Sequence, residues 1–589
     1  MEKRYLRRGF ALAVTAAMAL AACTPAGTSP SGSPSASATP TLSRGAGGEL
    51  KILYWQAPTI LNIHQATGTK DADAGRLILE PLASWGPDGK PLPNGLASEI
   101  PTLENGGVSK DFTTVTWKLR TGVKWSDGSA FTADDVVFTW KYLADEPTAS
   151  ANSDYATGIT SVVAKDPNTA VVTYADPNPN YYQFGVGGTG VILQKKQFEP
   201  TLGAKASESP ENLKPIGTGP YKLDNFKPGD VVTYVINDGY RDSTKPFFKT
   251  VTLKGGGDAT TAARAVFQTG DVDYAWNLQV EAPVLRSLID TGGKGDYLGL
   301  AGPNIERVNL NFANPDPALG DNRSEPTTKH PFFNGPDGKI VRQALAMATD
   351  RATVAKELYG DGLTGKASCN QLNGNPVFES KNTASLPVCK FDVAAASKLL
   401  EDNGWVKGSD GVRAKGSIKL KLLFGTTNVS LRQKTQDVLK KGWEQAGFSV
   451  ELKSVPASVF FTNTSPDGAN KMFYDVTMYT NGTDPDPTTY MSSWTCKNVT
   501  AKANNWNSPN YHRYCNPTYD GLIDQLRKET DPAKRNQLAI QANDIIVGDV
   551  VVIPLVNRFA VASGRAKALK GVVLTGWDSE MWQIADWSK

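Results

Sequence analysis

The sequence predicts an α/β fold with more than one lobe. Short segments of alternating apolar residues, typical of strands, recur along the chain, and the second half adds segments of helical periodicity that end at glycines. Strands and helices that alternate in this way are typical of α/β proteins. The chain has 589 residues, more than one hydrophobic core of ~250–300 residues accommodates.

The first 23 residues are typical of an export signal. A basic stretch that ends at Arg8 precedes an apolar run, from about Gly9 to Leu20, which is too short to span a bilayer as a helix. The segment Leu20-Ala-Ala-Cys23 resembles the lipobox of bacterial lipoproteins, in which the cysteine is diacylated and becomes the new N-terminus. We therefore expect a signal peptide over 1–22 and a lipid anchor on Cys23. A plain signal peptide with a coincidental cysteine is the alternative, and the choice between Sec and twin-arginine export stays open.

The next stretch, 24–48, consists almost wholly of Thr, Ser, Pro, Ala and Gly, and it lacks the apolar surface needed to fold. We expect 23–48 to be a flexible tether between the lipid and the body. Removal of 1–22 leaves 58 basic and 58 acidic residues, because it deletes four of the 62 Lys and Arg and one of the 59 Asp and Glu. A neutral mature chain argues against nucleic acid as a partner.

The first half of the body is rich in predicted strands. An alternating β-prone segment at 49–55 opens the fold, and further strands are predicted at 113–119, 170–174, 231–236 and 308–312. A helix is predicted to begin after Thr132, since Asp135 stands at the third position of a near-capping box and Phe131 with Val136 makes a hydrophobic staple.

Helices dominate the second half. One is predicted over 338–359 and ends at Gly360, a second runs from Asp392 to about Gly404, and a third covers 429–446. The third is followed by a strand over 448–453. There is no internal repeat and no second apolar segment long enough to span a membrane.

A glycine-rich segment, 360–366, satisfies G-x-G-x-x-G and most of the P-loop pattern. Both patterns need a preceding strand, whereas this segment follows a predicted helix. Ala367 stands where a Mg²⁺-binding hydroxyl is needed. We interpret the segment as a glycine-rich helix exit, not as a phosphate cradle.

Catalytic and metal-binding patterns are missing from the sequence. The three histidines lie far apart, and no H-E-x-x-H, C-x-x-C or G-x-S-x-G pattern exists. The segment Asp484-Pro-Asp486-Pro lacks the further ligands of a calcium loop, so a turn is the simpler interpretation. We expect no enzymatic activity, no cofactor and no metal.

The remaining cysteines fall into two close pairs, Cys369 with Cys389 and Cys496 with Cys515. In an exported protein two local disulfides are the simplest pairing, and free buried thiols are the alternative. Aromatic residues also crowd the stretch 474–511, where they either stack on a ligand or fill the core; for each one taken singly, packing is the safer interpretation.

Five segments together resemble the family-5 substrate-binding proteins of ABC transporters, the dipeptide- and oligopeptide-binding type. These segments are Trp117–Gly128 with Phe131–Phe138, Ile216–Lys222, Phe267–Asp273, Val341–Arg351 and Ala396–Trp405. The resemblance runs from about residue 49 to the C-terminus and implies a periplasmic-binding-protein-like fold of type II, in its large family-5 variant.

That fold implies two lobes that clasp a ligand and one extra lobe. The expected ranges are 49–85, 213–308 and 546–589 for the first lobe, 86–212 for the extra lobe and 309–545 for the second lobe. The ligand is expected between the first and second lobes, held by hinge closure.

The resemblance also implies ligand contacts. In peptide-binding members an Asp three residues before an Asp/Glu-Pro step pairs with the peptide α-ammonium, and the matching position here is Asn481. A neutral amide lacks a charge-assisted bond, so Asp484 or Asp486 is expected to substitute, or the ligand lacks an amine. Trp55 and Trp494 are the expected aromatic contacts.

The expected function is that of a solute receptor of an ABC importer. It captures peptides or peptide-like solutes and delivers them to a membrane permease, as a monomer anchored by lipid to the outer face of the cell membrane. An oligosaccharide receptor of the same fold is one alternative, which Asn481 favours. A scaffold of the cell envelope with a filled cleft is another, and an extracytoplasmic hydrolase is a third, for which the sequence shows no activated nucleophile.

Overall fold

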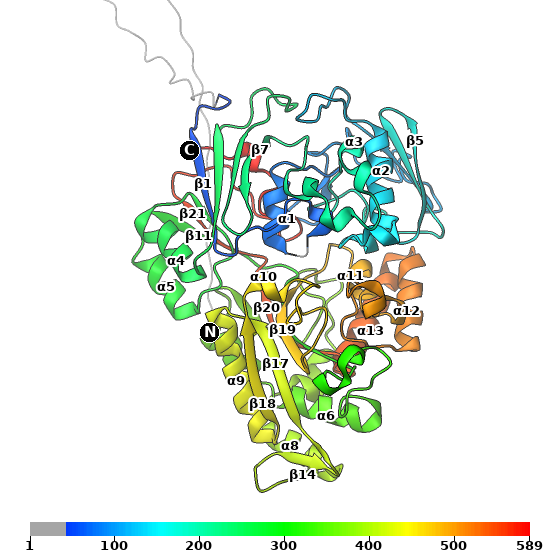
Figure 1. The fold of residues 1–589 in the computed structure, drawn as a ribbon, viewed down its shortest axis with the longest axis vertical. Helices are drawn as coiled ribbons and strands as arrows, with labels where there is room; N and C mark the ends of the chain where they lie inside the picture. Colours follow the sequence, from blue (N-terminus) through cyan, green and yellow to red (C-terminus); the bar gives the residue numbers. More distant parts are fainter. Residues whose placement is uncertain (1–42, 67) are drawn as a thin grey trace, which may run out of the picture. The chain divides into compact units, whose positions relative to one another are not determined.

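Two large β-sheets carry the architecture of residues 43–66 and 68–589, the part of the chain that this computed structural model describes (Figure 1). The predicted signal peptide over 1–22 and the predicted lipidation site Cys23 lie outside the described residues. We call the seven-stranded sheet and the elements packed on it the first lobe, the six-stranded sheet with its helices the second lobe, and the three-stranded sheet of β4, β5 and β6 with its helix the extra lobe.

The sheet of the first lobe has the strand order β11-β21-β10-β1-β9-β8-β7. Its central strand β1 pairs in parallel with both β9 and β10, and the alternating Leu50, Ile52 and Tyr54 are buried, as the sequence predicts. The strands are β1 (Glu49–Tyr54), β7 (Tyr221–Lys227), β8 (Val231–Ile236), β9 (Thr250–Gly255), β10 (Tyr274–Ala275), β11 (Gly295–Leu300) and β21 (Val561–Ala566).

The sheet of the second lobe has the order β13-β20-β12-β19-β17-β18. Strand β12 is buried along its whole length between β19 and β20, so it forms the centre of this lobe. Helix α9 (Ser430–Ala446) runs beside β17 and β18 (Figure 1). The strands are β12 (Ile305–Leu310), β13 (Gly365–Ala367), β17 (Lys421–Thr427), β18 (Ser449–Val455), β19 (Val476–Asn481) and β20 (Val552–Arg558).

The extra lobe consists of β4 (Thr114–Lys118), β5 (Ile159–Asp166) and β6 (Thr169–Tyr174), with α2 (Ala133–Ala144) packed on β5. The capping box predicted at the start of α2 is present, since the backbone N–H of Thr132 donates to Asp135 Oδ2 over 3.0 Å. Its core includes Trp117 and Trp125, which are almost fully buried. Short strands elsewhere are β2 (Ser84–Trp85), β3 (Pro91–Leu92), β14 (Val406–Lys407), β15 (Arg413–Lys415) and β16 (Ile418–Lys419).

The helix predicted over 338–359 is interrupted. Helix α6 (Gly335–Met347) ends, and α7 (Arg351–Thr353) begins a new turn because Asp350 caps it, accepting a 2.9 Å hydrogen bond from the backbone N–H of Thr353. The other α-helices are α1 (Thr69–Arg76), α3 (Lys195–Phe198), α4 (Ala259–Arg264), α5 (Ala282–Asp290), α8 (Val393–Asp402), α10 (Ala457–Phe460), α11 (Thr488–Ser492), α12 (Pro517–Lys528) and α13 (Pro532–Gly548). No helix in the described part of the chain is long and apolar enough to cross a membrane.

The chain passes between the two large sheets at two short connections, 301–304 after β11 and 559–560 after β20. Because Leu300 pairs with Val561 on one side and Ile305 with Asn557 on the other, the two connections run next to each other. Strands β12 and β20 thus belong to the second lobe, and the boundaries expected after 308 and 545 move to these connections. The lobe to which a strand belongs depends on the strands it pairs with, and the residue pattern of one segment does not predict its pairing partners.

The expected tether is also too long at its C-terminal end. Residues 43–48 are bonded to the first lobe, through Gly45 N–H to Pro246 O at 3.0 Å and Gly47 N–H to Phe247 O at 2.9 Å. Backbone hydrogen bonds hold this segment although its composition is polar and small.

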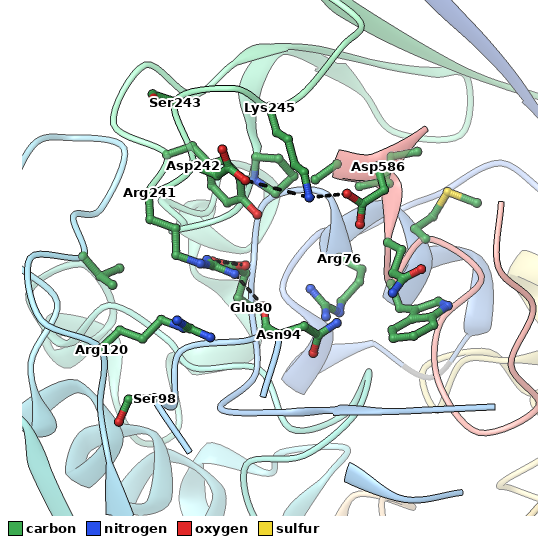
Figure 2. A pocket seen from close by; sticks show the side chains of 18 of the residues that line it. Arg76, Glu80, Asn94, Ser98, Arg120, Arg241, Asp242, Ser243, Lys245 and Asp586 are labelled. Atoms are coloured by element: carbon green, nitrogen blue, oxygen red, sulfur yellow. Dashed lines mark hydrogen bonds and ion pairs between the residues drawn. The ribbon is translucent and has the colours of Figure 1, made fainter. Parts of the chain in front are cut away.

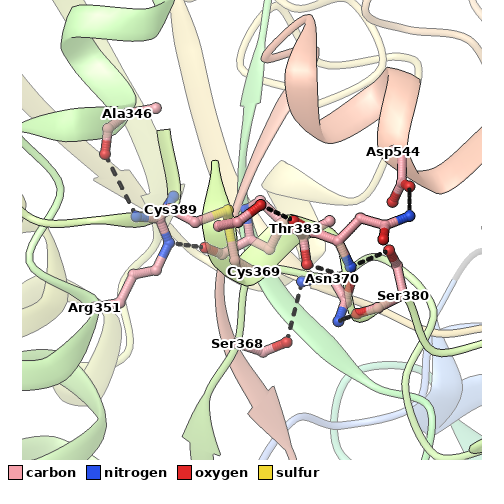
Figure 3. Close-up of a disulfide and its surroundings, with 12 residues drawn as sticks. Ala346, Arg351, Ser368, Cys369, Asn370, Ser380, Thr383, Cys389 and Asp544 are labelled. Atoms are coloured by element: carbon pink, nitrogen blue, oxygen red, sulfur yellow. Dashed lines mark hydrogen bonds between the residues drawn. A yellow bond between two sulfur atoms is a disulfide. The ribbon is translucent and has the colours of Figure 1, made fainter. Parts of the chain in front are cut away.

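Two disulfides join Cys369 to Cys389 and Cys496 to Cys515, the pairs expected from the sequence. Figure 3 shows the first of them in the second lobe, beside a polar network in which Asn370 Nδ2 donates to Ser380 O and Thr383 Oγ1 donates to Asn370 Oδ1. Each closes a short loop, with sequence separations of 20 and 19.

We predict that replacing either cysteine pair by serines lowers the free energy of unfolding by about 3 kcal/mol, since the entropy of closing two loops of nearly equal length is nearly equal. Urea unfolding of the two double variants measures the loss, with reduced wild-type protein as control. Markedly unequal losses would show that loop closure is not the main contribution of these disulfides.

Candidate functional site

A cavity of about 580 Å³ lies between the first and second lobes, with part of its wall from the extra lobe. The first lobe contributes the start of α1, the residues after β10 and the loop 575–580. The second lobe contributes the end of β19 with the loop that follows it, and Arg558 at the end of β20. Trp85, Asn152 and Thr189 lie on the third side. A cavity of this volume accommodates a small organic ligand.

The connections between the sheets form part of the same wall. Asn304, Arg558 and Ala560 line the cavity and either belong to a connection or adjoin one. The pairing is tight, because Asn557 Nδ2 donates to the carbonyls of Gly302 and Asn304 at 2.8 and 2.9 Å. A Cβ on Gly302 would lie only 2.5 Å from Ala560 Cβ, so the close approach requires glycine. The cavity therefore lies against the two connections on which the lobes would hinge.

Carboxyl groups gather on the first-lobe side. Asp73 accepts hydrogen bonds from Tyr54 OH at 2.9 Å and Ser579 Oγ at 2.5 Å, and burial raises its pKa to about 6 against the effect of these bonds. Glu580 Oε2 accepts from Ser563 Oγ at 2.7 Å and from Tyr274 OH. Burial, and next the charge of Asp73, raise the pKa of Glu580 to about 8. Glu580 is therefore mostly protonated at neutral pH.

Glu580 also has free hydrogen-bonding capacity. Both of its bonds end on Oε2, and Oε1 accepts none from the described residues. Since Glu580 lines the cavity, its Oε1 is available to a donor there. A positively charged donor would favour the ionised carboxylate and lower its pKa.

Asp484 and Tyr155 connect the second lobe to the extra lobe. Tyr155 OH donates to Asp484 Oδ2 over 2.8 Å, and burial raises the pKa of Asp484 to about 6 although this bond opposes the shift. Asp578, from the first lobe, also lines the cavity, and burial raises its pKa too. The cavity thus has carboxyl groups on two of its sides.

Two arginines lie on the second-lobe side. Arg558 donates to Thr480 Oγ1 at 3.2 Å and to Asn277 Oδ1, across the lobes. Arg432 is held by the buried Glu306, with Nε to Oε1 at 2.8 Å and Nη2 to Oε2 at 3.2 Å. Burial would raise the pKa of Glu306, but the charge and hydrogen bonds of Arg432, together with Arg558 and Thr480, outweigh this effect, and the pKa lies below its ordinary value. A ligand between these walls would meet carboxyl groups from both large lobes and the guanidinium of Arg558 from the second lobe.

Aromatic rings complete the wall. Trp276 lies in the cavity and stacks on Tyr54 with centroids 4.6 Å apart and planes 3° apart. From the second lobe, Tyr479 and Tyr511 line it as a tilted pair 5.9 Å apart. Such rings offer flat apolar contact area to a bound ligand.

The five predicted ligand contacts divide into two groups. Asn481 is exposed at the end of β19 and lines the cavity with Asp484. Asp486 instead pairs with Arg535 and accepts a 2.9 Å hydrogen bond from the N–H of Thr488, at the start of α11.

The two predicted tryptophans pack in the interior and do not line the cavity. Trp55 is buried and donates to Asn277 O at 2.8 Å, and Trp494 packs against the guanidinium of Arg307, 5.2 Å from its ring centroid. Of the neighbouring rings of Trp55 and Trp276, whose centroids are 6.5 Å apart, only Trp276 lines the cavity.

The most distinctive cavity residues did not stand out in the sequence. Glu580 and Asp578 belong to a loop, Gly576-Trp-Asp-Ser-Glu580, whose mixture of acidic and aromatic residues is a weak signal for a site. Asp73 lies in α1 among other charged residues, and nothing in the pattern separates it from a solvated helix face. Arg558 at the end of the apolar strand 552–558 is a somewhat clearer signal.

The other patterns considered in the sequence lie away from this cavity. The segment 360–366 follows a short helix and leads into β13, with Gly360 at φ +70°. His64 bonds to Val191 O, His330 to Asp475 and His512 to Leu310 O, all at separate places. Among the residues that the structure describes, no group of three or more His, Cys, Asp or Glu is placed to hold a metal ion.

The chain matches a model of the bacterial extracellular solute-binding proteins, family 5, over residues 93–502. It is 25% identical over 425 residues to the oligopeptide-binding protein AppA of Bacillus subtilis, and this alignment covers 71% of each chain. It is 26% identical over 526 residues to the periplasmic oligopeptide-binding protein OppA of Salmonella typhimurium, which covers 84% of each.

Solved structures have the same fold. That of Bacillus subtilis AppA with a nonapeptide superposes with a TM-score of 0.77 at 20% identity, over 92% of this chain and 99% of the other. The structure of NikZ from Campylobacter jejuni with Ni(L-His) superposes with a TM-score of 0.75 at 21% identity, over 92% of this chain and 99% of the other. These similarities confirm the predicted α/β fold of type II.

We predict that Glu306→Gln lowers the free energy of unfolding by about 3–5 kcal/mol, because it leaves the buried guanidinium of Arg432 without its carboxylate. Urea unfolding measures the loss. The matched control is Glu444→Gln, which removes an exposed carboxylate 3.5 Å from Lys440 and should cost no more than about 0.5 kcal/mol. Equal stabilities of the two variants would contradict the importance of the buried pair.

Proposed function

The chain belongs to family 5 of the bacterial extracellular solute-binding proteins, and on that premise we propose that it captures peptides or peptide-like solutes between its two large lobes and delivers them to an ABC permease. The observation that carries this proposal is the cavity at the inter-lobe connections, which is lined by carboxyl groups from both large lobes and by the guanidinium of Arg558. A peptide carries an ammonium group and a carboxylate at its two ends, and these charges match such a distribution.

We assign the recognition of the ammonium group to Glu580, with Asp484 as a second carboxyl group across the cavity. Asn481 offers only a neutral amide, and its Oδ1 already accepts a 2.9 Å hydrogen bond from Gly482 N–H. Glu580 has the free Oε1 described above. Its charge-assisted bond to an ammonium would be roughly twice as strong as a neutral one. Arg558 is the matching group for a ligand carboxylate.

The oligosaccharide alternative is less well supported. Relatives of this chain are named for oligopeptides and for glutathione, and carboxyl groups with raised pKa values suit a cationic ligand better than a neutral sugar. A cavity of about 580 Å³ also argues against a scaffold whose cleft is filled by side chains. Binding followed by lobe closure requires no covalent step, and we propose no enzymatic activity.

We further propose that Cys23 is lipidated and that the protein works as a monomer at the outer face of the cell membrane. The lipobox-like Leu20-Ala-Ala-Cys23 and the small-residue stretch that follows it support the anchor. A palmitate-labelling experiment on Cys23→Ser and wild-type cells tests it, and label on both would contradict it.

The function is tested by calorimetric titration of the purified protein with di- to pentapeptides, their N-acetylated forms and oligosaccharides. We predict that peptides with a free amino group bind and that their affinity rises between about pH 5.5 and 7.5. The pKa of ligand-free Glu580 is about 8, so its carboxyl group is protonated at lower pH. Pairing with an ammonium group requires loss of that proton, and the free-energy cost of losing it falls as the pH rises. One released proton gives at most about a tenfold gain per pH unit.

Two controls make this pH dependence specific. N-acetylated peptides have no ammonium group, so their affinity should be nearly constant. Glu580→Gln keeps Asp73 and Asp484, whose pKa values are about 6, so its affinity should level off above that pH while the affinity of the wild type continues to rise. An equal rise for acetylated peptides would remove Glu580 from the ammonium site. Binding of sugars with no response to peptides would refute the peptide proposal itself.

A second prediction concerns the position that the family resemblance singled out. Asn481→Asp should strengthen binding of peptides with a free amino group by about tenfold, because it adds a carboxylate at the cavity wall. Asn505→Asp, which makes the same change at an exposed residue outside the cavity, is the control. Unchanged affinity in Asn481→Asp would exclude position 481 as an amine contact.

A further inference from the structure

A second cavity, of about 720 Å³, lies where the first lobe meets the extra lobe. It shares no lining residue with the cavity between the two large lobes. Its wall is formed by the end of α1 with Glu80, by the segments 94–98 and 120–123 of the extra lobe, by 240–245 and by 581–586. Figure 2 shows this cavity from close by.

The lining is unusually charged, and cations are in excess. Four cationic side chains, Arg76, Arg120, Arg241 and Lys245, stand against the three carboxylates of Glu80, Asp242 and Asp586. Two of the cations are neutralised locally. Arg241 Nη1 contacts both oxygens of Glu80, at 2.7 and 2.6 Å, and Lys245 pairs with Asp586 and, at 3.8 Å, with Asp242.

Arg76 has no carboxylate partner within hydrogen-bond distance among the described residues. Its Nη1 donates to Leu79 O at 3.2 Å and its Nη2 to Ser84 Oγ at 2.9 Å, both neutral acceptors. Nε is buried and has no hydrogen-bond partner in this part of the chain, although the residue is only 4% exposed. A buried guanidinium with an unused donor is costly unless an anion compensates it.

Arg120 is the second guanidinium without a carboxylate. Nε donates to Gly95 O at 3.0 Å and Nη2 to Pro93 O, and neither bond neutralises the charge. Partial burial and then the charge of Arg241 lower its pKa, with Glu80 opposing. In Figure 2 the guanidinium groups of Arg76, Arg120 and Arg241 point toward the same region of the cavity, around Glu80 and Asn94. Guanidinium groups arranged in this way suit an oxyanion, which accepts paired N–H donors.

The rest of the wall is apolar or neutral. Pro220, Tyr240, Met581 and Trp582 line the same cavity, and its volume exceeds that of an inorganic oxyanion many times. A ligand with one compact anionic group and an attached ring or chain would use both parts.

We propose that this cavity is a second binding site, which takes a small organic anion whose phosphate or carboxylate group is held by Arg76 and Arg120 and whose apolar part packs on Tyr240 and Trp582. The site is spatially separate from the peptide cavity and requires no lobe closure, because all of its wall belongs to the first and extra lobes. Arg241, whose charge is neutralised by Glu80, contributes little to the binding of the anion.

The test is calorimetric titration of the purified protein with phenyl phosphate, inorganic phosphate and citrate, at a constant ionic strength of about 0.15 M so that screening is the same throughout. We expect phenyl phosphate to bind more tightly than inorganic phosphate, since only it carries a ring. Citrate distinguishes carboxylate from phosphate recognition.

Variants test whether the anion binds in this cavity. Arg120→Gln should weaken phenyl phosphate binding by about tenfold or more, and Arg120→Lys should weaken it less, because it keeps the charge and loses the planar fork. Lys118→Gln, the same charge change at an exposed residue of β4, is the matched control and should bind as wild type does. The affinity for peptides should be the same in the wild type and in the three variants. This result distinguishes failure of the anion site from failure of the proposed peptide function.

Two results would overturn the proposal. One is the absence of binding by all three anions beyond the effect of sodium chloride at the same ionic strength. The other is equal affinity of wild type, Arg120→Gln and Lys118→Gln, which would assign any binding to a different surface.

Discussion

The two adjacent connections between the large sheets are the constraint on which the rest of this structure depends. Because β11 pairs with β21 and β12 with β20, the segments 301–304 and 559–560 must run together from one sheet to the other. Asn557 donates to two carbonyls of the neighbouring connection, and Gly302 leaves no room for a side chain against Ala560. Two short, adjacent antiparallel connections resist sliding of the lobes but permit rotation about them, which is the motion of hinge closure.

The position of the cavity follows from that constraint. Asn304 and Arg558 lie both at the connections and in the cavity wall, so a ligand that contacts them contacts the hinge region. The carboxyl groups come from segments far from the hinge in sequence, and their pKa values are raised because each is desolvated near others of the same charge. A cationic ligand relieves this repulsion, and closure around it would remove the remaining water.

The two cavities are connected by electrostatics. Arg76 lines the cavity at the extra lobe, and its charge favours the ionised form of Asp578, which lines the cavity between the large lobes. Both side chains also interact with Ser84, which accepts from Arg76 Nη2 and hydrogen-bonds to Asp578. An anion beside Arg76 would weaken its effect on Asp578, so occupancy of one site and protonation in the other are coupled, and any such coupling is reciprocal.

The sequence by itself determined what depends on short-range pattern. It predicted the strand with Leu50, Ile52 and Tyr54 on one face, the cap of Thr132 and Asp135, and the two cysteine pairs, because each needs only residues close together in the chain. Five ordered segments sufficed for the family and the fold. Only the tertiary structure decided that β12 and β20 belong to the second lobe, and that Trp276, not Trp55, faces the cavity. Glu580 acquires its raised pKa from burial and from Asp73, and its partner Tyr274 lies 306 residues away in sequence, a contact that no local periodicity encodes.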